Sequence, residues 1–169
     1  GDVYKRQHDD IFRGSKGELP ITDLEYRDPL CEAFIKGAVE EGIPLNKDYN
    51  GEFQEGVSYV QRTTKGRFRV SAAKAFLNPV KSRQNLNVIT DAFVTKIVIE
   101  NKTATGVEYL KGGVRGKKEI LRANKEVILS SGVIKSPHLL NLSGIGSGEY
   151  LKDIGIDVIH DLKGVGMNL

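Results

Sequence analysis

The residues best placed to do chemistry lie between positions 130 and 146, SSGVIKSPHLLNLSGIG. They follow the apolar run 127–129, which predicts a buried strand. Ser136 is a candidate helix N-cap, and Pro137 suits the first helical position because its missing N–H would have no intrahelical partner there. The pattern therefore predicts a strand, a tight turn and a short helix, whose free N–H groups could hold a phosphate.

These residues also carry a family resemblance. Gly132, Ser136, Pro137 and the run 143–146 resemble the second signature motif of the glucose–methanol–choline (GMC) flavoprotein oxidoreductases. Other stretches resemble landmarks of that family in the same order, and they are 48–51, 55–56, 66–67, 85–86 and 164–169. The resemblance covers roughly residues 12–169. Within the family, the chain is most similar to choline dehydrogenases.

The resemblance implies an α/β fold of mixed α+β content, made of parts of two domains. Residues 1–70 would form part of the substrate-binding domain. Residues 71–169 would form part of a Rossmann-like FAD-binding domain, with a three-stranded β-meander as its crossover. Residues 1–10 are charged, unpatterned and unlike the family. We leave them out of the fold prediction, and whether they are native stays open.

FAD is the cofactor that the resemblance implies, and Val94 is the specific residue that it adds. In the family, a valine at the matching position reads the adenine edge with its backbone N–H and C=O. Without the resemblance, Val94 would be interpreted as an ordinary buried strand residue. Ser130, Ser131 and Gly132 also have two explanations, because small residues admit an adenosine but also suit any tight turn. With Ser136, these residues form the candidate cofactor site.

Local patterns predict the elements that would position this site. Strands are expected at 92–99, 104–110 and 119–121, and turn-rich segments between them indicate a meander. Asp28 and Pro29 open a helix that Gly42 ends. Cys31 falls on the apolar side of this helix, so we expect it to pack in a core rather than to react. Further helices are expected at 72–81, capped by Ser71, and at 147–154.

Composition limits the possible functions. The chain has 169 residues, a net charge of +3 and one cysteine, and its basic residues are scattered rather than clustered in a stripe. These features argue against nucleic-acid binding and an internal disulfide. We expect no transmembrane segment, because no window of 18 residues is continuously apolar. The acidic residues lack metal-ligand spacing, so no metal site is assigned.

The expected function is that of an internal fragment of an FAD-dependent oxidoreductase that oxidises the CH–OH group of choline or another primary alcohol. A G-x-G-x-x-G turn is absent from this sequence. The histidine that the family uses in catalysis is expected outside it, so no catalytic residue is assigned. Alternatives are a flavin-containing relative of the hydroxynitrile lyases and a non-catalytic α/β binding module. The electron acceptor, quinone or oxygen, and the location, cytoplasmic or peripheral to the inner membrane, stay open.

Overall fold

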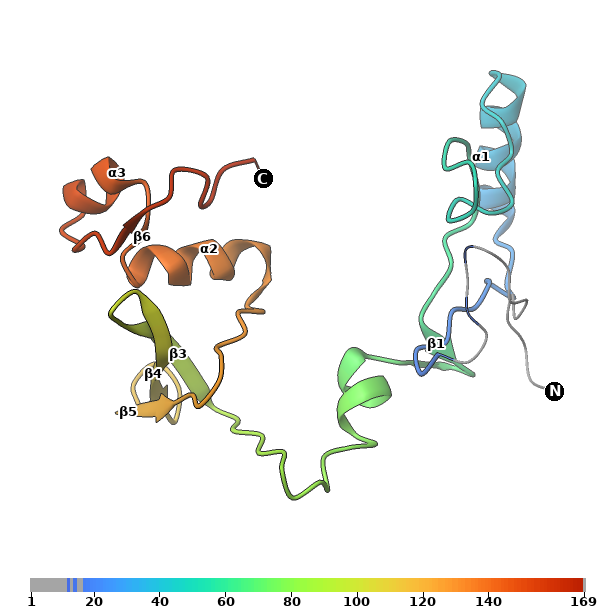
Figure 1. Cartoon of the computed structure of the whole chain (residues 1–169). Helices are drawn as coiled ribbons and strands as arrows, with labels where there is room; N and C mark the ends of the chain where they lie inside the picture. The colour runs from blue at the N-terminus through green and yellow to red at the C-terminus, as the bar shows by residue number, and fades with distance from the viewer. Residues whose placement is uncertain (1–11, 13, 15–16, 169) are drawn as a thin grey trace. The chain divides into compact units, whose positions relative to one another are not determined.

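The computed structural model describes residues 12, 14 and 17–168 (Figure 1). The chain divides into two compact units, Gly1–Val88 and Ile89–Leu169, which we describe separately. The mixture of helices and small open sheets agrees with the expected α/β class. The domain boundary expected after residue 70 stays a prediction, because a compact unit need not coincide with a functional domain.

Helix α1, Pro29–Glu40, is the main element of the first unit. Asp28 caps it, since its Oδ1 accepts the Leu30 N–H at 2.9 Å, and Pro29 stands at the first turn. Gly42 follows the helix with a φ of +91°, a backbone angle that favours glycine. The predicted start and end of this helix are therefore confirmed.

The described residues of the first unit leave the apolar face of α1 uncovered. No residue of the helix is buried, and Leu30 and Phe34 are 81% and 73% exposed. Cys31 is exposed as well, so the expectation that it packs in a core is wrong. The apolar residues do recur along one side of the helix, but no described helix or strand of this unit lies over them.

The rest of the first unit contains little regular structure. A short hairpin joins β1, Thr64–Lys65, to β2, Phe68–Arg69. Residue 72 and the π-helix η1, Ala73–Leu77, form a short helical segment, and turns follow it. The helix expected over 72–81 is therefore too long, although the Ser71 hydroxyl accepts the Lys74 N–H at 3.2 Å as a cap would.

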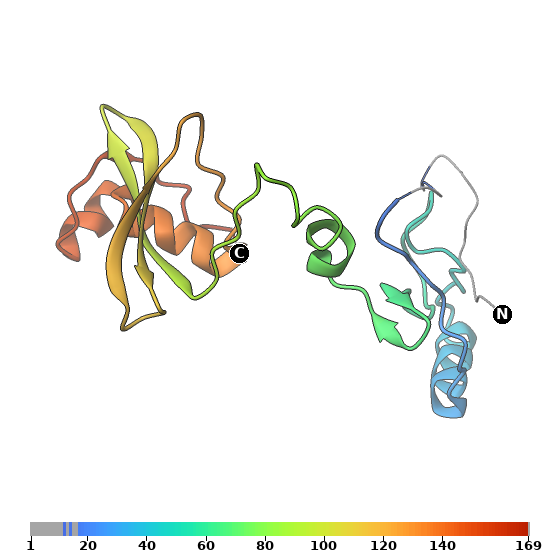
Figure 2. The same cartoon turned by 90° about the horizontal axis from the view of Figure 1, so that it is seen from below.

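The second unit is built on the predicted meander. Strands β3, Ala92–Glu100, β4, Thr103–Lys111, and β5, Lys117–Arg122, pair antiparallel in the order β3-β4-β5 (Figure 2). Asn101 and Lys102 turn the first hairpin with φ values of +51° and +64°. Positive φ at both positions is the geometry of a tight two-residue hairpin turn.

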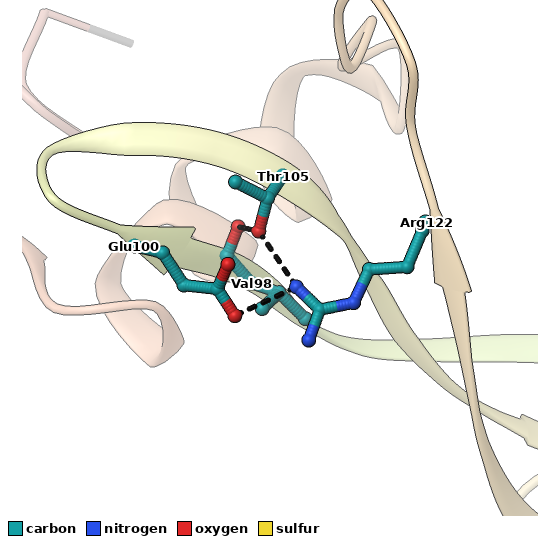
Figure 3. Close-up of polar contacts among 4 residues, drawn as sticks. All are labelled: Val98, Glu100, Thr105 and Arg122. Atoms are coloured by element: carbon teal, nitrogen blue, oxygen red, sulfur yellow. Dashed lines mark hydrogen bonds and ion pairs between the residues drawn. The ribbon is translucent and has the colours of Figure 1, made fainter.

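An exposed polar cluster lies at the end of the meander beside this hairpin (Figure 3). The Arg122 guanidinium donates to Glu100 Oε1 at 2.7 Å and to Thr105 Oγ1 at 3.0 Å, and Thr105 donates to the Val98 carbonyl at 3.4 Å. The hydrogen bond from Arg122 lowers the pKa of the Glu100 carboxyl. The cluster ties β5 to both strands of the hairpin.

Three further elements complete the second unit. Helix α2, Gly132–Leu142, packs against β3. Strand β6, Ile145–Gly146, pairs parallel with β7, His160–Asp161, and helix α3, Gly148–Asp153, lies between them in the sequence. Ser147 is the N-cap of α3, which confirms the helix predicted there.

The core of the second unit is small and lies between the meander and the C-terminal elements. Leu151 of α3 is fully buried, and Ile97, Tyr109 and Leu139 are nearly so. Ser143, directly after α2, is the buried polar residue among the described positions. Within the described range, no helix is both long enough and apolar enough to cross a membrane.

Candidate functional site

Val94 lies on β3, which forms one edge of the three-stranded sheet. Its side chain is 36% exposed. Because the described residues place no strand on the outer side of β3, backbone groups that point away from β4 have no ladder partner there. The backbone of Val94 is therefore accessible if its N–H and C=O point outward.

The pairing register settles this direction. Val94 pairs with Tyr109 and Lys96 with Glu108, so Thr95 is the extra residue of a β-bulge. Ile97, next along the strand, points its N–H away from β4, because it donates to the Ser143 hydroxyl at 2.8 Å. Successive pairs of an antiparallel ladder alternate in direction. Counted back across the bulge, this alternation turns the N–H and C=O of Val94 to the open edge.

The bulge is held by side-chain bonds. The Thr95 hydroxyl donates to Glu108 Oε1 at 2.8 Å and lies 3.3 Å from the Glu108 carbonyl oxygen. Lys118 Nζ approaches the same carboxylate at 3.0 Å. The bond from Thr95, and then the Lys118 ammonium, lower the pKa of the Glu108 carboxyl. Glu108 is therefore ionised near neutral pH and fixes the extra residue in place.

The segment before α2 is not the buried strand that its apolar run predicts. Residues 126–130 have no ladder partner within the described chain, and Ile128 is 79% exposed. Val127 and Leu129 nevertheless line a mainly apolar cavity of about 410 Å³, together with Ile97 of β3 and Leu140 of α2. The segment thus has the alternating faces of a strand, but it lacks the neighbour that a strand requires.

The helix after this segment begins earlier than predicted. Helix α2 starts at Gly132 with Ser131 as N-cap, so Pro137 lies inside the helix and Ser136 does not cap its start in the expected way. Instead, the Ser136 hydroxyl accepts the Ser131 N–H at 3.1 Å. Pro137 is tolerated because it removes only one bond, the one that would reach the Val133 carbonyl.

The turn at the start of α2 is open. Ser130, Ser131 and Gly132 are all exposed. Gly132 has a φ of +85°, and a Cβ built there would meet nothing within 4 Å. Glycine is therefore required at this position by its backbone angle and not by crowding from the described residues.

The start of α2 also has the electrostatics of an anion site. With the Ser131 N–H bonded to Ser136, the next N–H groups, from Gly132 to Ile134, have no intrahelical partner. The first turn carries no acidic side chain, and the helix dipole adds partial positive charge there. Val133 and Ile134 are 70% and 68% exposed, so the first turn is accessible.

All five sequence-predicted residues lie in the second unit, on β3 or at the start of the helix that packs against β3. Ser131 and Ser136 are joined directly, whereas Val94 lies on the neighbouring strand. Sequence reasoning assigned no role to Thr95 or Ser143. The signal for Ser143 was available, since a hydroxyl among the apolar residues that close α2 needs a polar partner.

The described residues contain no group of three or more His, Cys, Asp or Glu side chains that could hold a metal ion. His138 of α2 is exposed. The site is therefore made of backbone groups, hydroxyls and a helix start. Such an arrangement can bind and orient a ligand with a flat polar ring and a phosphate, but it offers no base or nucleophile of its own.

Sequence comparison places this chain among flavoproteins. The sequence model of the family described as GMC oxidoreductase matches residues 3–169. The oxygen-dependent choline dehydrogenase of Rhizobium rhizogenes is 46% identical over 158 residues, which are 94% of this chain and 28% of that protein. The alcohol dehydrogenase [acceptor] of Pseudomonas putida is 42% identical over 158 residues, with the same coverage of 94% and 28%. The chain thus spans less than a third of these relatives.

Solved structures give the same result. An FAD-dependent oxidoreductase from Chaetomium thermophilum matches with a TM-score of 0.81 and 32% identity, over 90% of this chain and 26% of that one. Pyridoxine 4-oxidase from Mesorbium loti matches with a TM-score of 0.78 and 30% identity, over 89% of this chain and 29% of that one. The expected kinship and the mixed α/β fold are both confirmed.

Proposed function

This chain belongs to the GMC oxidoreductase family, and on that premise we propose that it is the adenosine-binding part of an FAD-dependent enzyme that oxidises the CH–OH group of an alcohol. The observation that carries the proposal is the open edge of β3. There the bulge at Thr95 turns the backbone of Val94 outward. An N–H and a C=O side by side match the donor and acceptor on the edge of an adenine ring.

The start of α2 supports the same ligand. The side chains at 130–132 are small and exposed, so the flat or sugar part of a nucleotide can approach their backbone. The free N–H groups that follow and the absence of an acidic side chain in the first turn favour a phosphate. Because α2 packs against β3, one ligand could contact both elements. These features fit the adenosine half of FAD.

In this proposal, the chain binds and orients the cofactor and does not carry out the reaction. Bound FAD would supply the acceptor for the hydride that leaves the alcohol carbon. Val94 would hold the adenine, and the small residues Ser130, Ser131 and Gly132 would leave room for the ribose. Ser136 would hold the backbone of this turn in place through its hydrogen bond with the Ser131 N–H. The base that removes the alcohol proton would come from outside these residues.

The substrate we propose is choline or a similar primary alcohol. The named relatives at 42–46% identity support this choice, since they are a choline dehydrogenase and an alcohol dehydrogenase. They also favour oxidation over a lyase reaction that uses flavin without redox change. The acceptor that reoxidises the flavin would be oxygen or a quinone.

The proposal is tested with the full-length protein, purified and examined for the visible absorbance of bound flavin. We expect FAD to be released on denaturation, and choline or another primary alcohol to bleach the bound flavin under anaerobic conditions. Oxygen uptake measured beside dye reduction then separates the two acceptors. A protein that lacks flavin after purification and takes up none from solution would refute the proposal.

A further inference from the structure

We infer that Ser143 is a positioning residue for the cofactor site, because its buried hydroxyl joins the end of α2 to the open edge of β3 and so fixes the Val94 backbone relative to the start of α2. This inference rests on the proposed function. Ser143 does not touch the ligand in this account. It acts through the two elements that do.

The Ser143 side chain forms a hydrogen bond with α2 and another with β3, and we call this pair of bonds the clamp. Its side chain is fully buried, and its hydroxyl donates to the Leu139 carbonyl of α2 at 2.7 Å. The same oxygen accepts the N–H of Ile97 at 2.8 Å, 46 positions earlier in the chain. One small side chain thus uses both of its hydrogen-bonding functions, one for each element. Ile97 is itself buried, so its N–H has no ready substitute in water.

The clamp acts on the edge that the ligand would use. Ile97 and Val94 both direct their backbone groups away from β4, and they are separated by Thr95, the bulge residue, and Lys96. An edge strand with a bulge can bend and twist more than a regular central strand. A fixed point at Ile97, three residues from Val94, limits that freedom near the adenine position.

The two elements extend in the same direction from the clamp. Helix α2 runs back from Ser143 to Gly132, and β3 runs back from Ile97 to its start at Ala92. In Figures 1 and 2, both α2 and β3 begin toward the right of the second unit. A small rotation at the clamp would therefore be enlarged where the two elements begin. The spacing between Val94 and the turn at 130–132 would then depend on this contact as well as on the packing of α2 against β3.

The test measures adenosine binding separately from stability. Apoprotein of the full-length enzyme is titrated calorimetrically with FAD and with AMP, and urea unfolding is followed for each variant. Ser143→Ala removes the clamp, and we expect it to weaken both ligands about tenfold, because binding would then have to restore a geometry that the two lost hydrogen bonds no longer hold. Leu151→Ala is the matched control, because it empties a fully buried position of α3 in the same unit and leaves the hydrogen bonds of Ser143 in place.

The conservative variant Ser143→Thr keeps the hydroxyl and adds a methyl group to a packed site. We expect it to lower stability and yet to bind AMP like the wild type, as Leu151→Ala should. If Ser143→Ala does not fold, Ser143→Cys replaces it, because sulfur is a weaker partner of nearly the same shape, and its affinity should fall between those of Ser143→Ala and the wild type.

Two outcomes separate this inference from the proposed function. A wild-type apoprotein that binds neither AMP nor FAD overturns the proposed function and, with it, the role of Ser143. A wild type that binds both, with Ser143→Ala or its replacement binding within about twofold of it, overturns the positioning role alone. Loss of affinity in Leu151→Ala to the same degree as in Ser143→Ala does so as well, since any destabilisation would then suffice.

Discussion

Replacement of Gly132 by alanine tests the cofactor site with a control that the chain itself provides. Gly132 has a φ of +85° and Gly113, in the hairpin between β4 and β5, has a φ of +84°. A Cβ at either position would meet nothing within 4 Å. The two substitutions therefore introduce the same backbone strain, about 1–2 kcal/mol, with no clash to add to it. Only Gly132 lies in the proposed site.

We expect Gly132→Ala and Gly113→Ala to lower the free energy of unfolding by similar amounts in urea titrations. Their effects on FAD should differ. A methyl group at Gly132 would stand where the nucleotide approaches the backbone, so the affinity of the apoprotein should fall at least about tenfold, whereas Gly113→Ala should bind normally. Flavin fluorescence quenching during titration measures both affinities. Equal affinities in the two variants would refute the placement of the cofactor at this turn.

The remaining predictions concern the frame around the site. Glu108→Gln should lower the free energy of unfolding at pH 7 and make that free energy less dependent on pH in acid. The pKa of Glu108 is lowered in the folded protein, so its carboxylate stabilises the fold above the ordinary pKa of about 4.3, and this stabilisation is lost as the pH falls through the lowered pKa. Urea unfolding midpoints measured over a series of pH values check this. Gly144→Ala should lower the free energy of unfolding by roughly 3 kcal/mol or more, since φ is +81° and the added Cβ would lie 2.5 Å from the Asp157 carbonyl oxygen. A variant that fails to express, or a much lower urea unfolding midpoint, would show this loss. Arg122→Met should leave the urea midpoint nearly unchanged, because its ion pair is exposed.

The parts of the fold that could be predicted are those encoded by neighbouring residues. The meander follows from alternating apolar residues between two turn-rich segments, and all three of its strands are present. The cap at Asp28 and the glycine stop at Gly42 are also local signals, and the structure contains both of them. Each such signal needs only a few consecutive residues to act.

The parts that could not be predicted depend on distant partners or on competing local solutions. A strand at 127–129 requires a neighbouring strand, which periodicity cannot supply. Ser136 and Pro137 match the residues preferred at a helix start. In the structure, however, the Ser136 hydroxyl accepts the Ser131 N–H, and Pro137 lies inside α2, where only one backbone hydrogen bond is lost. Ser143 finds its partner 46 positions away. Patterns of neighbouring residues cannot predict a contact between positions so far apart in the sequence.

The candidate site shows the same division. The resemblance selected Val94, yet nothing in the sequence indicated how its backbone could be reached. That answer came from the register, in which Thr95 is an extra residue. The amino-acid pattern of a strand with one bulge residue does not differ from that of a regular strand, so the bulge cannot be predicted from sequence alone. The assignment of Val94 and of residues 130–132 and 136 to the cofactor stays a prediction.

The open edge of β3 has a consequence for the protein before it acquires its cofactor. A nine-residue strand that has no neighbour on one side among the described residues can recruit a strand from another molecule and begin aggregation. The bulge at Thr95 interrupts such an edge, and the Ser143 hydroxyl already occupies the Ile97 N–H in its middle. Both features should reduce edge-to-edge pairing between molecules of newly made apoprotein. Supplying flavin during expression should raise the soluble yield further.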